Sequence, residues 1–536
     1  MMLIKLTNKI KAHARINWPF YLVWLGSVVI FSIPIFLMNL QIFGDEPEIV
    51  ESAINIMGGY KTPLKTVDIK LLSSLLEPYS FLYGSIYSYL LALIGIIYTA
   101  IFGDNFRSTL HIYTMFRFIN LLIFVSSGFI FSKILFKITK QRSFSIIGFL
   151  MYLLIPIGVA RTQFVNQDIL GLFFFVGVLY MFLLVYNAIV SKSRNLYYEL
   201  GILGILLGFL ISSKITYVII LVPITVLFFV FFKKYSQLKN FFIGEMLVVA
   251  TMIIAYIFSF PHSIINYNKY ISRIIEMRSL ESQIAIDSYH PEVYFYVIRI
   301  ILFFAPLILF LLYTLLKKDY RKQIIKFLKK EIVYSYLAIL ITILFFFSLQ
   351  VRKTDRWGLP IYVLSLLILL LFIWNLAKRK HLYIVTILNI VILLLMSSYV
   401  YAYFLKEDPR ITLKHYLQNN ASVENQAFLI TSYGNNMGAD EVEHVLPIRH
   451  QVYSKKMVGY DPYEMKVDWN NFTYFAIGNN VIQDFKNKEN LAKFTKIKNW
   501  NDWLESISKN SSKIVIGAKH IYFQPQIGFT VFTVIK

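Results

Sequence analysis

The sequence predicts a polytopic α-helical membrane protein with about eleven transmembrane helices and a small C-terminal α/β domain. Of its 536 residues, 57% are apolar and only 15% are charged, whereas soluble proteins are roughly 45–50% apolar and about 25% charged. Long apolar runs alternate with short basic clusters up to residue 405, and the sequence is polar beyond that point. A soluble globule could not bury so much apolar surface, and an aromatic content of 17% excludes a disordered chain.

The excess of basic residues points to lipid rather than to nucleic acid. The chain has 53 Lys and Arg residues against 30 Asp and Glu residues, a formal net charge of +23. These cations gather between apolar runs, where they orient helices and meet anionic headgroups. We therefore expect membrane lipid, and no nucleic acid, among the partners. The chain has no cysteine, which excludes disulfides, thiolate metal sites and cysteine nucleophiles.

The first apolar run, residues 18–43, is expected to remain as a spanning helix. The apolar region of a signal peptide has only about 7–15 residues, and this run is longer. Four basic residues precede it, namely Lys5, Lys9, Lys11 and Arg15. Because cytoplasmic segments collect Lys and Arg, the N-terminus is expected on the cytoplasmic side.

Hydropathy alone offers twelve runs that could cross about 30 Å of hydrocarbon. They are residues 18–43, 83–102, 111–136, 144–160, 169–190, 200–213, 215–232, 241–260, 293–316, 332–350, 358–377 and 383–404. Basic clusters between the runs test this number. They are Lys5 to Arg15; Lys133, Lys137, Lys140 and Arg142; Lys192 and Arg194; Lys233, Lys234 and Lys239; Lys317 to Lys330; and Lys378, Arg379 and Lys380.

Charge parity reduces the twelve runs to eleven spans. From the second cluster onward, basic residues occur at every other loop, so twelve crossings would place the N-terminal cluster on the opposite side from all the others. One run before residue 133 should therefore not cross. The best candidate is 83–102, which contains Gly84 and many tyrosines and has no cytoplasmic type of cluster beside it. We expect it to lie in or re-enter the outer interface, which Tyr prefers.

An odd number of spans places the C-terminal part outside the cytoplasm. We therefore expect a transmembrane domain at 1–405 and an extracytoplasmic α/β domain at 406–536, in a protein of the bacterial plasma membrane. Short β-like runs support the α/β assignment. They are Ala427 to Tyr433, Lys513 to Ala518, His520 to Phe523 and Gly528 to Ile535.

The first outer loop, about 44–110, opens with two adjacent carboxylates, Asp45 and Glu46, followed by Pro47. Pro47 is expected to end the first helix, and the amphipathic stretch from Glu48 to Met57 would keep the acids near the membrane surface. Such a pair is usable as a general base with a supporting partner. The alternative is a solvated helix terminus.

Further ionisable residues are expected on the outer face. Asp168 and Arg161 lie between two spans, and Asp168 could also be only a helix N-cap. Lys214 and Arg356 are basic residues on the side where Lys and Arg are rare. Arg117 lies inside an apolar run, where an unpaired charge is costly. Together these cations could hold a phosphate leaving group while a carboxylate takes the acceptor proton.

No metal ligand or cofactor is assigned from the sequence. Outer carboxylates could hold a divalent cation, but the Lys and Arg residues could neutralise a phosphate without one. His262 and His290 could bind a metal or position an acceptor. Histidines in such loops are more often solvated.

At these residues the chain resembles the GT-C superfamily of membrane glycosyltransferases, in particular the branch of protein O-mannosyltransferases and the aminoarabinose transferase of lipid A. The resemblance covers roughly residues 15–380. Its motifs are Asp45-Glu46, Glu77-Pro78-Tyr79 through Tyr83, Arg117, Pro156 with Asp168, Gly201-x-x-Gly204-x-x-x-Gly208 to Lys214, and Arg356 before Pro360. Two departures are Trp357 after Arg356, where the family has Tyr, and an entry motif without the basic residue of the aminoarabinose branch.

The resemblance implies a GT-C fold and an inverting transfer of a hexose or pentose from a polyprenyl-phosphate-linked donor. The acceptor would be a protein, lipid or glycan at the outer membrane face. In this hypothesis Asp45 is the general base, and Glu46 and Asp168 shape the catalytic site. Donor phosphate is bound by four cations, which are Lys214, Arg356, Arg117 and Arg161. The alternatives are a lipid or glycolipid transporter and a receptor whose outer domain binds a ligand.

Overall fold

The computed structural model describes most of the helical part of the chain and the strands of the C-terminal part. The described residues are 2–37, 46–57, 85–103, 109–272, 274–275, 293–350, 355–376, 379–405, 412–413, 416, 426–430, 452–453, 472–478, 482, 495–509, 511–517 and 528–534. The predicted general base Asp45, together with His290, lies outside them.

Within these residues, nine helices are long and apolar enough to cross a membrane, and two bent helix pairs bring the number to eleven. The nine straight spans lie in α1 (Met2–Leu37), α5 (Thr109–Thr139), α8 (Gln167–Ser191), α9 (Leu196–Ser213), η2 (Ile215–Ile220) with α10 (Leu221–Lys234), α11 (Leu238–Ser259), α17 (Glu331–Ser348), η3 (Asp355–Gly358) with α18 (Leu359–Leu376), and α19 (Arg379–Phe404). The prediction of a polytopic helical protein with about eleven spans is confirmed.

Each bent pair changes direction where the chain places a proline. α6 (Arg142–Leu153) and α7 (Pro156–Thr162) meet at 63°, and Pro156 opens α7. α14 (Phe295–Phe303) and α15 (Ala305–Leu316) meet at 92°, with a proline in the first turn of α15. Proline has no N–H to continue the preceding helix but fits the first turn of a new one. One pair thus ends with the short helix α7, and the other begins with the short helix α14, each turned away from the direction of its partner.

The first loop holds two helices that pack on each other, α2 (Glu46–Ile56) and α4 (Ile86–Phe102). α4 has 17 residues, which at 1.5 Å per residue is short of the hydrocarbon thickness. The Ser88 hydroxyl donates to the Ile49 carbonyl, and a Cβ at Gly95 would lie 2.5 Å from the sulfur of Met57. The apolar run 83–102 therefore is not one of the eleven spans, as charge parity predicted.

One expectation for this loop is wrong. Pro47 does not end the first helix, because the described part of α1 ends at Leu37 and Pro47 lies in the first turn of α2. A proline is tolerated there because the first N–H groups of a helix have no partner within it. Pro47 therefore lies at the start of α2 rather than at the end of the spanning helix.

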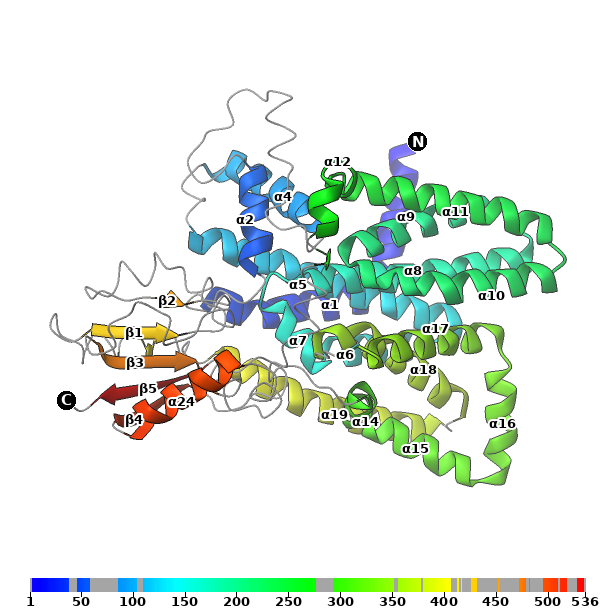
Figure 1. Ribbon diagram of the computed structural model, residues 1–536. Helices are drawn as coiled ribbons and strands as arrows, with labels where there is room; N and C mark the ends of the chain where they lie inside the picture. The colour runs from blue at the N-terminus through cyan, green and yellow to red at the C-terminus, as the bar shows by residue number, and fades with distance from the viewer. Residues whose placement is uncertain are drawn as a thin grey trace.

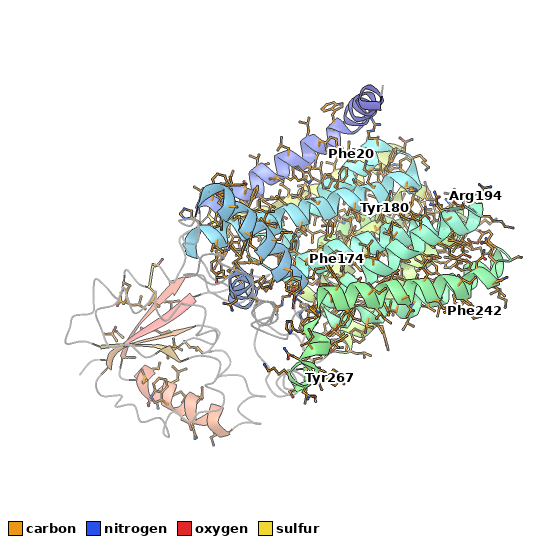
Figure 2. All side chains as sticks on the ribbon, turned by 90° about the horizontal axis from the view of Figure 1, so that it is seen from above. Phe20, Phe174, Tyr180, Arg194, Phe242 and Tyr267 are labelled. Carbon is orange, nitrogen blue, oxygen red and sulfur yellow. The ribbon has the colours of Figure 1, made fainter. Side chains whose placement is uncertain are left out.

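The bundle has two chemically different ends (Figure 1). The basic end holds the turns at 140–141, 192–195 and 235–237, and α16 (Lys318–Leu328) runs across it. The sheet end holds α2, α4, α7, α12 (His262–Ile265) and the C-terminal strands. Figure 2 shows Arg194 at the end far from the sheet and Tyr267 at the end nearer to it.

Helix α9 approaches α11 unusually closely. A Cβ at Gly204 would lie 2.4 Å from the Val248 carbonyl oxygen, and one at Gly208 would lie 2.4 Å from the Met252 carbonyl oxygen. Glycines spaced by four residues on one helix face let two backbones come together within a membrane. This contact fixes the end of α9, and with it Lys214, against the bundle.

The C-terminal strands form one mixed sheet in the order β2-β1-β3-β5-β4. β1 (Gln426–Ile430) pairs in parallel with β2 (Val452–Tyr453) and β3 (Phe472–Gly478). β5 (Gly528–Val534) pairs antiparallel with β3 and β4 (Ser511–Gly517). α24 (Thr495–Lys509) packs on the β4 and β5 side.

Three of the four predicted β-like runs overlap β1, β4 and β5, and the fourth, 520–523, lies outside the described residues. The strand β3 was not predicted, although its sequence FTYFAIG is rich in aromatic and apolar residues. The α/β character of this part is confirmed. α19 ends at Phe404, next to the boundary that the composition predicted.

Candidate functional site

The chemistry-bearing side chains of the sheet end come from helix termini and breaks. Asp168 lies in the first turn of α8, Lys214 between α9 and η2, and Arg356 in η3. Charged side chains at such points can pair with one another away from the lipid-facing surface of the bundle. The structure brings together these three predicted residues, which are far apart in the sequence.

Asp168 is the centre of this cluster. Lys214 donates from Nζ to Asp168 Oδ1 at 2.8 Å, and Arg356 Nε lies 3.8 Å from Asp168 Oδ2. The Asp168 side chain is buried, and those of Lys214 and Arg356 are 17% and 18% exposed. The carboxylate therefore holds both cations while leaving each of them a way to reach a ligand.

Asp168 is not the N-cap of its helix, which corrects one of the alternatives that the sequence allowed. The N-cap is Asn166, whose side-chain oxygen accepts from the Asp168 N–H at 2.7 Å. Asp168 lies two residues further on, where the helix dipole favours a negative charge. Its carboxylate is thus available to Lys214 and Arg356.

Lys214 is an extended residue that separates the helices α9 and η2. Its backbone has φ −158° and ψ 114°, and its N–H still closes α9 by donating to Leu210. The ammonium group lies over the ring of Trp357, 5.1 Å from the centroid. Trp357 follows Arg356 in η3, so α9 and η3 meet at this cation–π contact.

A second ion pair joins α2 to α5. Arg117 donates from Nε to Glu46 Oε1 at 2.7 Å and from Nη2 to Glu46 Oε2 at 2.6 Å. Both side chains are almost completely buried, at 2% and 1% exposure. The Val165 N–H also donates to Glu46 Oε1, at 2.9 Å. Both carboxylate oxygens of Glu46 are therefore engaged, and α2, α5 and the α7–α8 connection are tied together.

Asn120 anchors the same connection from one turn further along α5. Its amide nitrogen donates to the carbonyl oxygens of Arg161 and Phe164, at 2.9 and 2.7 Å. Its oxygen accepts from the Tyr87 hydroxyl at 2.7 Å. Burial, followed by the nearby charge of Glu46, raises the pKa of Tyr87 well above its ordinary value, which keeps this phenol a neutral donor. Sequence analysis did not identify Asn120 or Tyr87.

Sequence analysis also missed a third ion pair, between Arg299 on α14 and Asp355 at the start of η3. Arg299 Nε donates to Asp355 Oδ1 at 2.9 Å, and Nη2 donates to Oδ2 at 3.2 Å. Arg299 lies within the apolar sequence FYVIRIILF, and a cation inside an apolar run is the signal that had identified Arg117. Arg161, buried in α7, acts electrostatically on Asp355 and on Asp168.

The resulting site is positively charged. Four cations, Lys214, Arg356, Arg161 and Arg299, surround two carboxylates, Asp168 and Asp355. An excess of cations in a partly buried setting attracts an anion more strongly than the same charges in water. The arrangement suits a phosphate group.

In the described part of the chain, no three His, Asp or Glu side chains lie together in a way that could hold a metal ion. The carboxylate of Asp168 faces Lys214 and Arg356 rather than other acids. His262 is buried, and one of its ring nitrogens, Nδ1, lies 3.0 Å from the Asn266 amide nitrogen. The expectation of a solvated histidine is therefore wrong for His262.

No protein-family model matches the sequence, and comparison with curated proteins finds no match either. Solved structures do match. The structure of ArnT from Cupriavidus metallidurans bound to undecaprenyl phosphate has a TM-score of 0.52 at 12% identity, covering 97% of this chain and 98% of that chain. The chain has the GT-C fold. The apo structure of the same ArnT has a TM-score of 0.49 at 11% identity, with the same coverage.

The GT-C fold agrees with the placement of the first loop. α2 and α4 cover most of the two stretches, Glu48 to Met57 and 83–102, that the sequence predicts at the membrane surface, and Glu46 on α2 pairs with Arg117. The predicted roles of Glu46, Asp168, Lys214, Arg356, Arg117 and Arg161 remain predictions.

Proposed function

We propose that this protein transfers a sugar from a polyprenyl-phosphate-linked donor to an acceptor at the outer face of the membrane. The observation that carries the proposal is the partly exposed pair of cations, Lys214 and Arg356, held by Asp168 at the sheet end. Donors of this kind carry a phosphate between the lipid and the sugar at the membrane surface, and such cations bind a phosphate through charge-assisted hydrogen bonds. That a GT-C structure with this fold, ArnT, was solved with undecaprenyl phosphate gives the proposal further support.

The proposed reaction is a direct displacement at the anomeric carbon. An acceptor oxygen or nitrogen forms the new bond to this carbon while the bond from the carbon to the phosphate oxygen breaks. The phosphate leaves on its polyprenyl lipid, and the acceptor proton passes to a carboxylate. Lys214, Arg356 and Arg161 stabilise the charge that grows on the phosphate. Asp45 is the proposed base, because both oxygens of Glu46 are already engaged.

In this proposal Glu46 and Arg117 act by positioning. The sequence predicts Arg117 as a phosphate ligand, but its Nε and Nη2 donate to Glu46 and its side chain is almost completely buried. The pair fixes the start of α2, which lies directly after Asp45 in the chain. The helix that follows the proposed base in the chain is therefore held firmly, as the productive geometry of a site requires.

Replacing Lys214 by Met should weaken donor binding by about 10- to 100-fold, the loss expected for one hydrogen bond to a charged group. Turnover should fall as well, because the contact strengthens when the leaving phosphate gains charge. Asp168 keeps Arg356 beside it, so the variant should fold. Donor affinity and turnover would be measured in nanodiscs, with Lys239→Met at the basic end as a matched control. Unchanged kinetics in folded Lys214→Met would remove Lys214 from the site.

The alternative of a lipid or glycolipid transporter predicts a different distribution of charge. Transporters place their binding site near the bilayer midplane on discontinuous helices. Here the ion pairs Glu46–Arg117, Asp168–Lys214 and Asp355–Arg299 each include a residue at the start or end of a helix. α2, which begins with Glu46, and α7, which precedes Asp168 in the chain, belong to the sheet end. This distribution favours a reaction at one membrane face.

We further propose that the N-terminus is cytoplasmic and that the sheet end is extracytoplasmic, because the turns of the basic end carry the Lys and Arg clusters. A single cysteine at Ser508 on α24 should react with a membrane-impermeant maleimide in intact cells. A cysteine at Asn195, in the α8–α9 turn, should react only after lysis. Both positions are exposed, and the chain has no cysteine of its own. The reverse labelling pattern would contradict this orientation.

A further inference from the structure

The ion pair between Arg299 and Asp355 lies beside the proposed donor site, but the proposed reaction does not use it. Its two hydrogen bonds, 2.9 and 3.2 Å long, join the guanidinium fork to both carboxylate oxygens. The side chains are only 10% and 9% exposed. A buried bidentate pair of this kind is directional and resists both sliding and rotation.

Asp355 is the first residue of η3, the single turn that carries Arg356 and Trp357. Arg356 reaches Asp168 at 3.8 Å, and Trp357 lies under the Lys214 ammonium group at 5.1 Å. Because a 3₁₀ turn rises only about 2 Å per residue, a shift of Asp355 must move both neighbours. The placement of two cations of the site therefore depends on this turn.

The turn is held at both ends. At its end, a Cβ on Gly358 would lie 2.5 Å from the ring of Tyr362, so the backbone packs directly on that ring. At its start, the two hydrogen bonds from the Arg299 guanidinium to Asp355 hold the turn. Arg299 lies on α14, whose axis is turned by 92° from that of α15. The bend thus brings a cation from a broken span to the beginning of η3.

We propose that Arg299 and Asp355 are positioning residues, which hold η3 so that Arg356 and Trp357 face the donor phosphate. This inference rests on the proposed function. It assigns Arg299 an action through Asp355 rather than a contact with the donor. Removing either partner should therefore have the same effect on donor binding.

The test compares Arg299→Met, Asp355→Asn and the double variant Arg299→Met/Asp355→Leu in nanodiscs. Each single variant should weaken donor binding by about tenfold or more, since small displacements of site groups are costly. The double variant should be no worse than the single ones, because both changes remove the same interaction. Arg299→Lys should lie between wild type and Arg299→Met. Glu331→Gln, which breaks an ion pair with Lys234 at the basic end, should leave donor binding unchanged.

Thermal unfolding of each variant separates positioning from loss of the fold. Replacing both members of a buried pair by apolar residues is often neutral for stability. If a single variant unfolds, donor binding can therefore still be measured in the double variant. Wild-type donor affinity in Asp355→Asn, with weak binding in Arg299→Met, would show that Arg299 binds the donor itself and would overturn the inference. Absence of donor binding by the wild-type protein would instead overturn the proposed function.

Discussion

Replacing Asp45 by Asn should lower the rate of sugar transfer by about 10²- to 10⁴-fold, the usual cost of losing a general base. Asp45 directly precedes Glu46, whose carboxylate is fixed by Arg117 and by the Val165 N–H. Both oxygens of Glu46 therefore already accept hydrogen bonds. Asp45 is the adjacent residue in the chain, so the fixed Glu46 limits how far Asp45 can move. The substitution keeps the shape of the side chain and removes its ability to take the acceptor proton.

Transfer from a polyprenyl-phosphate sugar would be measured with Asp45→Asn beside Asp168→Asn. Donor affinity should stay near the wild-type value in Asp45→Asn, whereas it should fall in Asp168→Asn, because Asp168 orients Lys214 and Arg356. Near wild-type turnover in Asp45→Asn would refute its role as base. The base would then be Asp168 or a residue of the C-terminal domain.

Breaking the buried pair of Glu46 and Arg117 should destabilise the protein by about 3–5 kcal/mol, the range measured when one partner of a buried ion pair is removed. In Arg117→Met the Glu46 carboxylate would remain buried, without the two hydrogen bonds from Arg117 and with the one from the Val165 N–H. The double variant Glu46→Leu/Arg117→Met should recover most of the lost stability, because no charge is left buried. Thermal unfolding in detergent would measure both.

The matched comparison is Lys234→Met, which removes the exposed partner of the ion pair with Glu331 at the basic end. Lys234 is 57% exposed, and Glu331, which is 10% exposed, would keep the hydrogen bond from the Tyr235 hydroxyl. The loss of stability should therefore be well below that of Arg117→Met. Equal effects of Arg117→Met and Lys234→Met would contradict the role given to the buried pair.

The number of spans could be predicted because it follows from additive properties of the sequence. Apolar length marks each run, and the alternation of Lys and Arg clusters predicted that 83–102 does not cross. The structure agrees with this prediction, because α4 has only 17 residues and packs on α2. Strands β1, β4 and β5 were identified from short apolar runs, but β3 was missed because neighbouring polar sequence hid its pattern.

Partners of the charged residues could be predicted only in part. The sequence indicated that Asp168, Lys214 and Arg356 share a membrane face, and the structure joins them. It could not show that Arg117 pairs with Glu46, because the two lie 71 residues apart and their contact depends on how α2 folds back. Arg299 and Asp355, 56 residues apart, meet only because the span that carries Arg299 is bent.

The most direct test of the account is an experimental structure of the protein in nanodiscs with undecaprenyl phosphate. The account predicts a phosphate at the sheet end, with an oxygen at hydrogen-bond distance, about 3 Å, from Lys214 Nζ and near the Arg356 guanidinium. Lys214→Met under the same conditions should lose this density. A phosphate bound at the basic end, or one at the sheet end that is unaffected by Lys214→Met, would contradict the account.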